Sequence, residues 1–488
     1  CRKELTEKEA CTLWLRSWIL IFLCWLPVFL AFYPGAFVYD AQEEYVQVAT
    51  RTFTTHHPLA HVLLLGGMVA AGNKFLGSFN AGIALYTICQ MIALSGVFGY
   101  SVVYIRRKMQ SKWGEWLPIL FYGLFPVIPM YAVCSAKDGI FTAALLVVIL
   151  QMLYFFEDPV AWMSKRSSRI AGILAAVVMM LFRNNGVYAY LLWSLCALAF
   201  LAACKYTRYT PKLMGRVGRM MLGALVLYLL IGRSTAGILD AAPGGKQELL
   251  TVPLQQMARV YAYAPDTYSV EERDTLYEIL PKEHLALYTP RISDLLKSGF
   301  NNDNFAADPA KYLALWIKIG LRSPMTYLNG WLLTSYGYWY PDSVINVYGG
   351  NTVHTYTYEE SSFFGFETEP PGLRESKLPL LEECYRKLSL TLYQQRVPGL
   401  SMLFSPGFLF WVYAFCMGYL LWRRGEHPCS MTAMTAKGGR ESLPMQRFVP
   451  LLLIFFLWLT VLPGPTYLVR YVLILWFALP VFVTAVKV

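Results

Sequence analysis

The run PLAHVLLLGGMVAAG, residues 58–72, decides how the rest of this 488-residue chain is placed in a membrane. The run is apolar but short, because a helix needs about 20 residues to cross the hydrocarbon core of a bilayer. It also carries His61 and three glycines. If the run crossed, every later loop would change sides, whereas a surface or re-entrant position would leave the later loops where they are.

Ten other apolar segments are predicted to be membrane-spanning helices. With 58–72 kept at the surface or re-entrant, the basic clusters at 106–108, 165–169, 205–219 and 423–447 fall on the side of the N-terminus. The short loops opposite carry few basic residues, and this asymmetry predicts that both termini are inside. The ten segments are 14–33, 79–104, 116–134, 139–156, 170–182, 187–203, 218–232, 402–422, 448–463 and 468–486.

The composition indicates the same class of protein. Hydrophobic residues make up 56% of the chain and charged residues only 15%, so we predict an all-α polytopic protein of the cell membrane, with the lipid bilayer as its first partner. The net charge of +11 lies in short clusters between apolar segments, which favours topology signals over nucleic-acid binding. The ten cysteines show neither a disulfide framework nor zinc-site spacing.

Three parts follow from this division. Residues 1–232 form an N-terminal transmembrane module whose first outer loop is 34–78, and residues 402–488 form the C-terminal transmembrane helices. The long segment 233–401 between them is large enough for a mostly helical extracytoplasmic domain. Within it, 325–341 is rich in Trp and Tyr, which suits a helix at the level of the lipid headgroups, with an extra span as the alternative.

The first outer loop contains the acidic stretch YDAQEEY at 39–45. A helix there would place Asp40, Glu43 and Glu44 on one face, since residues three and four apart are neighbours on a helix. We expect Glu43 and Glu44 to be solvated charges of an amphipathic helix, whereas Asp40 either is solvated as well or faces a cleft.

The same loop ends in TTHHP, residues 54–58. His56 and His57 are adjacent in the chain, so at most one of them can face a given site, as a proton carrier or as a hydrogen-bond donor to phosphate. A turn shaped by Pro58 is the alternative interpretation. Adjacent histidines do not have the spacing of a zinc site.

Three further outer turns carry isolated charges. SAKDGI places Lys137 and Asp138 at the start of a span, where charged residues are costly and usually functional. FRNNG and PTYLVRY place Arg183 and Arg470 on the side that carries few basic residues. Arginine binds phosphate and carboxylate in a bidentate manner, so these two are candidates for anion recognition. Asn184 and Tyr471 follow them directly.

This layout resembles the GT-C superfamily of membrane glycosyltransferases, which take sugars from polyprenyl-phosphate carriers. Asp40 matches the acidic residue of their first outer loop, and Asp138 matches the acid of the next outer turn. HHPL at 56–59 and RYVLILWFALP at 470–480 also look like motifs of these families. VPLQQMARV at 252–260 and YTPRISDLLKSG at 288–299 look like an uncharacterised bacterial group of multi-pass proteins.

The resemblance implies transfer of a hexose or pentose to a glycan, lipid or protein acceptor on the outer face of the membrane. Asp40 and Asp138 would be the catalytic residues, with Asp40 as the general base. A transporter or flippase, or a polymerase for lipid-linked glycans, is the alternative. No cofactor is assigned, and a divalent metal between Asp40 and Asp138 is kept open. The expected substrate-binding residues are His56, His57, Lys137, Arg183, Asn184, Arg470 and Tyr471.

Overall fold

The computed structural model describes residues 5–38, 40–203, 210–342, 370–390, 399–426 and 444–487. Every regular element in these ranges is a helix, and extended backbone pairs there only in two isolated bridges, between Ala36 and Cys134 and between Thr54 and Ala242. The predicted all-α class is confirmed for this part of the chain.

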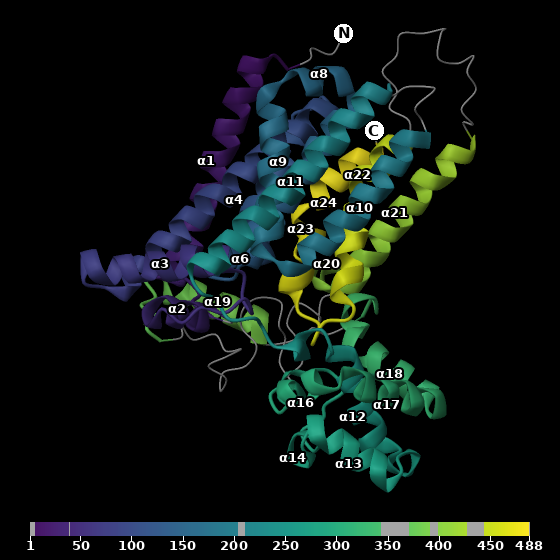
Figure 1. Cartoon of the computed structure of the whole chain (residues 1–488). Coiled ribbons are helices and arrows are strands. Elements are labelled where there is room, and N and C mark those ends of the chain that lie inside the picture. Colours follow the sequence, from purple (N-terminus) through teal and green to yellow (C-terminus); the bar gives the residue numbers. More distant parts are fainter. Residues whose placement is uncertain are drawn as a thin grey trace.

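Most of the helices form one tilted bundle (Figure 1). α7 lies in its interior, packed against α4, α9 and α22, because it is apolar around its whole circumference and must be covered on all sides. The bundle comprises α1 (Glu7–Ala31), α4 (Phe79–Met109), α5 (Trp113–Leu124), α6 (Val127–Ala132), α7 (Asp138–Glu157), α8 (Pro159–Ser164), α9 (Arg166–Phe182), α10 (Asn184–Ala203), α11 (Pro211–Ile238), α20 (Leu400–Phe404), α21 (Pro406–Glu426), α22 (Pro444–Val461), α23 (Ile474–Phe477) and α24 (Leu479–Lys487).

Among the described residues, six helices are long and apolar enough to cross a membrane: α1, α3, α4, α7, α10 and α11. Two of the expected spans are broken instead. The segment 116–134 is divided at Pro126 into α5 and α6, and the last segment is divided into a 3-10 turn, η5 (Val469–Val472), followed by α23 and α24. Proline disrupts a helix because it lacks the backbone N–H and clashes with the preceding turn.

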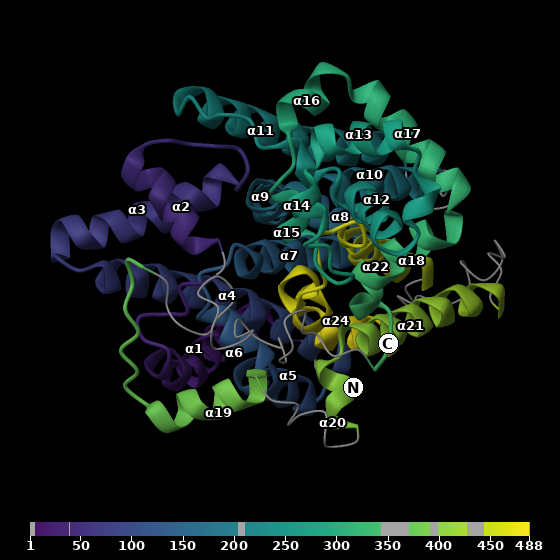
Figure 2. The same cartoon turned by 90° about the horizontal axis from the view of Figure 1, so that it is seen from below.

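The run 58–72 lies in α3 (Leu59–Leu76), which meets the length and hydropathy of a span. Figures 1 and 2 nevertheless show α3 extending sideways from the lower end of the bundle, beside α2 (Ala41–Thr50). α3 packs closely on the start of α4, where a Cβ atom on Gly72 would lie 2.3 Å from the Cα atom of Gly82. α19 (Pro379–Leu390) packs against α1 at this same end.

A second group of helices lies below the bundle and has a core of its own, which includes Leu254, Leu276 and Ile319. We call it the lower cluster. It lies below α10 and α22 and leaves α2 and α3 uncovered (Figure 2). Its elements are η1 (Lys246–Glu248), α12 (Thr251–Tyr263), η2 (Pro265–Thr267), α13 (Val270–Ile279), α14 (Lys282–Leu285), α15 (Asp294–Lys297), α16 (Asn302–Ala307), α17 (Pro309–Arg322), α18 (Pro324–Ser335) and η3 (Tyr336–Tyr338).

The structure differs from the expected boundaries of the segment 233–401 in two ways. The boundary at 232 falls inside α11, which continues to Ile238. Residues 370–390 return to the bundle, where the backbone N–H of Glu375 donates to the carbonyl of Tyr33 at 2.9 Å. The Trp- and Tyr-rich piece 325–341 forms α18 and η3, which join the lower cluster to the end of α22, since Trp331 Nε1 donates to the carbonyl of Leu462 at 3.3 Å.

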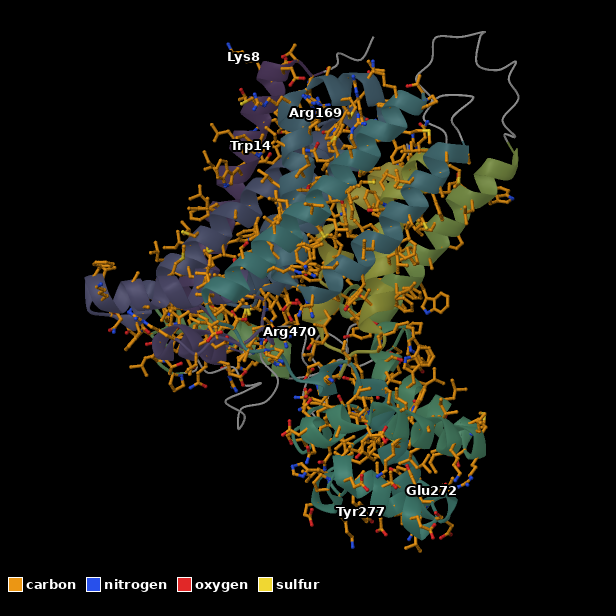
Figure 3. All side chains as sticks on the ribbon, in the orientation of Figure 1. Lys8, Trp14, Arg169, Glu272, Tyr277 and Arg470 are labelled. Atoms are coloured by element: carbon orange, nitrogen blue, oxygen red, sulfur yellow. The ribbon has the colours of Figure 1, made fainter. Side chains whose placement is uncertain are left out.

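The charged residues of the bundle gather at its two ends. At the upper end, Glu7 of α1 forms ion pairs with Arg107 at 3.6 Å and with Lys165 at 3.1 Å. These contacts bring together two of the basic clusters that the sequence places on one side, 106–108 and 165–169. Figure 3 shows Lys8 and Arg169 at this end and Arg470 at the lower end of the bundle.

Candidate functional site

Seven of the nine site residues predicted from the outer loops meet at the lower end of the bundle. A short backbone bridge explains how distant segments come together there. The N–H of Ala36 donates to the carbonyl of Val133 at 2.9 Å, and the N–H of Ser135 donates to the carbonyl of Ala36 at 3.0 Å. The first loop is therefore held against the turn before α7, and Asp40 faces Lys137.

Lys137 is the centre of this site. Its side chain is 11% exposed, and its ammonium donates to Asp40 Oδ2, to Glu44 Oε1 at 3.4 Å and to His57 Nδ1 at 3.3 Å. These groups come from the first loop, α2 and the turn before α3. We call Lys137, Asp40, Glu44 and His57 the lysine cluster.

Two arginines form the other half of the site. Arg470 of η5 lies between the aspartates, with Nη1 3.3 Å from Asp40 Oδ2 and 3.8 Å from Asp138 Oδ2. Arg183, between α9 and α10, pairs with Asp138 Oδ1. The ring of Tyr471 lies under both guanidinium groups, 4.6 Å from that of Arg183 and 4.9 Å from that of Arg470. Asp138 is fully buried and is the first residue of α7, where the helix dipole favours a negative charge.

The turn that carries Arg470 is held by the lower cluster. Tyr338 of η3 donates its hydroxyl to the carbonyl of Thr466 at 3.0 Å and accepts the N–H of Leu468 at 3.1 Å. Ser293 donates its N–H to the carbonyl of Pro465 at 2.9 Å. The position of Arg470 therefore depends on helices that lie outside the bundle.

Burial and charge oppose each other at Asp40 and Lys137. Burial alone would raise the pKa of Asp40, but the charges of Lys137 and Arg470 outweigh it and hold this pKa well below its ordinary value. Burial alone would lower the pKa of Lys137, but the carboxylates of Asp40 and Glu44 outweigh it and raise this pKa. Both groups are therefore charged at neutral pH.

Glu44 and His61 belong to the site, although Glu44 was expected to be solvated. That interpretation is wrong for Glu44, whose side chain is 1% exposed and contacts both Lys137 and His61 Nδ1. The sequence did contain a signal that Glu44 faces the site: it follows Asp40 by four residues, and residues i and i+4 share a helix face. Glu43, which is 60% exposed, remains at the surface and contacts His57 Nε2 at 3.0 Å.

A buried chain of hydrogen bonds continues from His61 and was not predicted. Gln90 Nε2 donates to two backbone carbonyls before α7 at 2.7 and 2.9 Å, so its Oε1 is left to accept the Tyr86 hydroxyl proton at 2.9 Å. The Tyr86 oxygen then accepts from His61 Nε2 at 2.7 Å. His61 Nδ1 and Glu44 consequently share one proton, and this contact holds Glu44 against Lys137.

His56 and Asn184 do not enter the site. His56 is exposed and packs edge-on against His57, with 4.5 Å between ring centroids. Asn184, the first residue of α10, lines a groove of about 320 Å³ together with His57, Tyr228 and Arg233. The groove runs between the start of α3, the junction of α9 and α10, and the end of α11, and its other walls are mainly apolar. It borders the lysine cluster through His57.

Asp40, Glu44 and His57 are also the residues that could hold a metal ion, since one ligand atom of each lies within 4.8 Å of the others. Asp138 is not part of this set, so a metal between Asp40 and Asp138 does not match the arrangement. The ammonium of Lys137 contacts all three ligand groups. The residues present therefore fit an ammonium and do not fit an additional metal.

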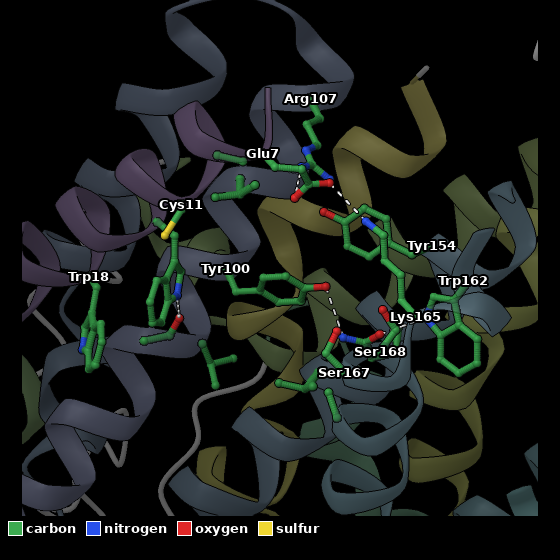
Figure 4. A pocket seen from close by; sticks show the side chains of 18 of the residues that line it. Glu7, Cys11, Trp18, Tyr100, Arg107, Tyr154, Trp162, Lys165, Ser167 and Ser168 are labelled. Carbon is green, nitrogen blue, oxygen red and sulfur yellow. Dashed lines mark hydrogen bonds and ion pairs between the residues drawn. The ribbon is translucent and has the colours of Figure 1, made fainter. Parts of the chain in front are cut away.

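A larger cavity of about 790 Å³ lies toward the opposite end of the bundle, between α1, α4, α7 and α8. Figure 4 shows Glu7 paired with Arg107 and Lys165 beside this cavity, with Tyr100, Ser167 and Ser168 among the other lining residues. None of the predicted site residues lines this cavity. The chemistry predicted from the sequence is concentrated at the lower end.

Comparison with known proteins identifies a family but supplies no activity. Nothing among curated proteins and nothing among solved structures matches the chain. A family model described as "Family of unknown function (DUF6020)" matches residues 45–425. The matched range includes His57, Lys137 and Arg183, whereas Asp40 and Arg470 lie outside it. Because the match covers more than three quarters of its length, the chain belongs to the DUF6020 family.

Proposed function

We propose that the chain is a membrane glycosyltransferase that moves a sugar from a polyprenyl-phosphate carrier to an acceptor hydroxyl. One observation carries the proposal. Lys137, Arg183 and Arg470 gather with Asp40 and Asp138 at one end of an apolar bundle, next to a largely apolar groove. A lipid-linked phosphate needs cations and apolar surface side by side, and this end of the molecule offers both.

The donor would enter from the groove. Its lipid chain would lie against the apolar side chains of α9 and α11, and its phosphate would reach the two guanidinium groups. Arg183 and Arg470 can each offer two N–H groups to phosphate oxygens, the pairing that arginine favours. The ring of Tyr471 packs against the guanidinium groups of both arginines. His57 and Asn184 line the groove between the lipid and the sugar.

Transfer would be a single displacement at the anomeric carbon. The acceptor oxygen forms a bond to this carbon as the bond to the phosphate oxygen breaks, and attack from the opposite face inverts the centre. The phosphodiester monoanion becomes a phosphate monoester with one more negative charge. Arg183 and Arg470 stabilise that developing charge.

Asp40 would take the proton of the acceptor hydroxyl. In the absence of donor, Lys137 and Arg470 make Asp40 a weak base, because a general base works best when its pKa is near the working pH. A phosphate bound to Arg470 would attract this cation away from Asp40 and raise the proton affinity of the carboxylate. Donor binding would thus activate the base, and Asp40 would be a poor base toward water until the donor is bound.

The orientation is part of the proposal. With the basic upper end in the cytoplasm, as the charge asymmetry predicts, the lower end faces the outside. Ten crossings would then require α9, α21, α22, the pair α5 and α6, and the group η5, α23 and α24 each to cross once, beside α1, α4, α7, α10 and α11. The lower cluster, next to Arg470, would select the glycan, lipid or protein acceptor.

The test is transfer of labelled sugar from a panel of polyprenyl-phosphate hexoses and pentoses by the purified full chain in liposomes. Asp40→Asn should lower the turnover by roughly 10²- to 10⁴-fold, while Asp240→Asn, a matched change at an exposed residue, should leave it unchanged. Equal turnover in all three proteins would remove Asp40 from the mechanism. Movement of labelled lipid across the bilayer without sugar transfer would indicate a flippase.

A further inference from the structure

We infer that the ammonium of Lys137 occupies the place of a divalent metal in the lysine cluster. The wild-type cluster then needs no metal, and removal of the ammonium opens a divalent-cation site made by Asp40, Glu44 and His57. This inference concerns cation binding and does not depend on the proposed transferase activity.

The spacing of the cluster suits an ammonium. Lys137 Nζ lies 3.4 Å from Glu44 Oε1 and 3.3 Å from His57 Nδ1. Bonds from zinc or magnesium to oxygen and nitrogen ligands are about 2.0–2.2 Å long. A metal at the position of Nζ would therefore be more than 1 Å too far from two of its three ligands. The cluster would have to contract, and it can do so only if the ammonium is gone.

The charges of the site already leave no room for a divalent ion. Three buried or nearly buried carboxylates, those of Asp40, Glu44 and Asp138, face three permanent cations. The cations are Lys137, Arg183 and Arg470. The proton shared by Glu44 and His61 makes that pair neutral as a whole, so the set carries one net positive charge. A divalent ion added to it would leave an excess of three positive charges in a region of low dielectric, where an unbalanced charge is costly.

The ammonium is also held firmly in place. Lys137 is the N-cap of α7, and its carbonyl accepts the N–H of Phe141 at 3.1 Å. Glu44 is kept in contact with it by His61, which is anchored through Tyr86. Movement of the lysine away from the cluster would leave Asp40 and Glu44 without their shared counter-ion. A metal ion can therefore bind at this position only after the ammonium group has been removed by substitution of Lys137.

The test is Mn²⁺ binding to the purified full chain in detergent, followed by electron paramagnetic resonance. Mn²⁺ is a suitable probe because it is paramagnetic and carboxylate ligands suit it. The wild type should show only weak Mn²⁺ binding that does not saturate. Lys137→Met should bind one Mn²⁺ per chain, at least about 100-fold more tightly than the wild type does. Adding Glu44→Gln to Lys137→Met should reverse most of this gain, because one of three ligands is lost.

Lys297→Met is the matched control. Lys297 is equally buried and contacts two carboxylates, Glu248 at 2.7 Å and Asp294 at 2.9 Å. Both of these partners are carboxylates and neither is a histidine, so loss of Lys297 should create a much weaker site. Similar Mn²⁺ affinities for both methionine variants would refute the role of the three-ligand set.

Two results would overturn the inference. One is a saturable Mn²⁺ site in the wild type that Asp40→Asn abolishes, since the metal would then bind beside the lysine. The other is a Lys137→Met protein that binds no Mn²⁺. If that variant is unstable, Mn²⁺ should raise its unfolding temperature, because a ligand that binds only the folded state stabilises it, and absence of this rise would equally reject the inference.

Discussion

Substitution of Asp138 by Asn tests whether the buried ion pairs hold the lower end of the bundle together. Asp138 is fully buried and contacts Arg183 through one oxygen and Arg470 through the other, the latter at 3.8 Å. Asparagine keeps the size of the side chain and removes its charge. Arg183 and Arg470 then lose a shared counter-ion while they stay largely buried, with exposed fractions of 14% and 7%.

The expected cost is large. Removal of one partner of a buried ion pair typically lowers the unfolding free energy by about 3–5 kcal/mol. Loss of a negative charge at the start of α7 adds up to about 1 kcal/mol, because the helix dipole favours an anion there. Unfolding by SDS in mixed micelles, followed by the fluorescence of the 14 tryptophans, measures this change.

Two comparisons make the result specific. Asp240→Asn is the same chemical change at an exposed residue with φ of 48°, which asparagine tolerates, so it should leave the unfolding free energy within about 0.5 kcal/mol of the wild type. Arg183→Gln combined with Asp138→Asn should cost less than the sum of the two single changes by about 1–3 kcal/mol. Full additivity, or a stable Asp138→Asn protein, would refute the buried pairing.

Two further predictions concern packing and pH. Gly72→Ala should lower the unfolding free energy by about 1–3 kcal/mol, because the added Cβ would lie 2.3 Å from the Cα of Gly82. The control is Gly67→Ala, whose Cβ would meet nothing within 4 Å and which should stabilise α3 by up to about 1 kcal/mol. Equal effects of the two substitutions on SDS unfolding would show that α3 does not pack on α4 in this way. The pKa of Asp40 is lowered, so its contribution to stability is present above its ordinary pKa and lost as the pH falls through the lowered one. The pKa of Lys137 is raised, so its contribution is present below its ordinary pKa and lost as the pH rises through the raised one. The unfolding temperature should therefore be flat between about pH 5 and pH 9 and fall on both sides, and an acid limb unchanged by Asp40→Asn would contradict this assignment.

α3 contributes to the surroundings of the lysine cluster. α3 supplies His61, and its first residues follow His57 directly. His61 lies in the first turn of α3, at the end of the helix next to the first loop. α3 extends sideways at the lower end and packs beside α2, which keeps His61 in contact with Glu44 (Figures 1 and 2).

The sequence by itself determined the class of fold and the neighbourhood of the site. Long apolar runs can satisfy their backbone hydrogen bonds in a membrane only as helices, so the helical bundle follows from hydropathy alone. The count of these runs, together with the basic loops, predicted that Asp40, Lys137, Asp138, Arg183 and Arg470 lie toward the same end. In the structure these five side chains meet.

Only the tertiary structure decided which groups touch. Glu44 and His61 are each ordinary in the sequence, one on an amphipathic helix and one in an apolar run, and their contact depends on how α2 lies on α3. The divided helices α5 and α6, and η5 with α23 and α24, were missed because hydropathy reports burial and not continuity of the backbone hydrogen bonds, although Pro126 already marks the first break in the sequence. The position of the Lys137 ammonium between three ligands depends on four separate segments, since a charge network is a property of distances that local sequence does not encode.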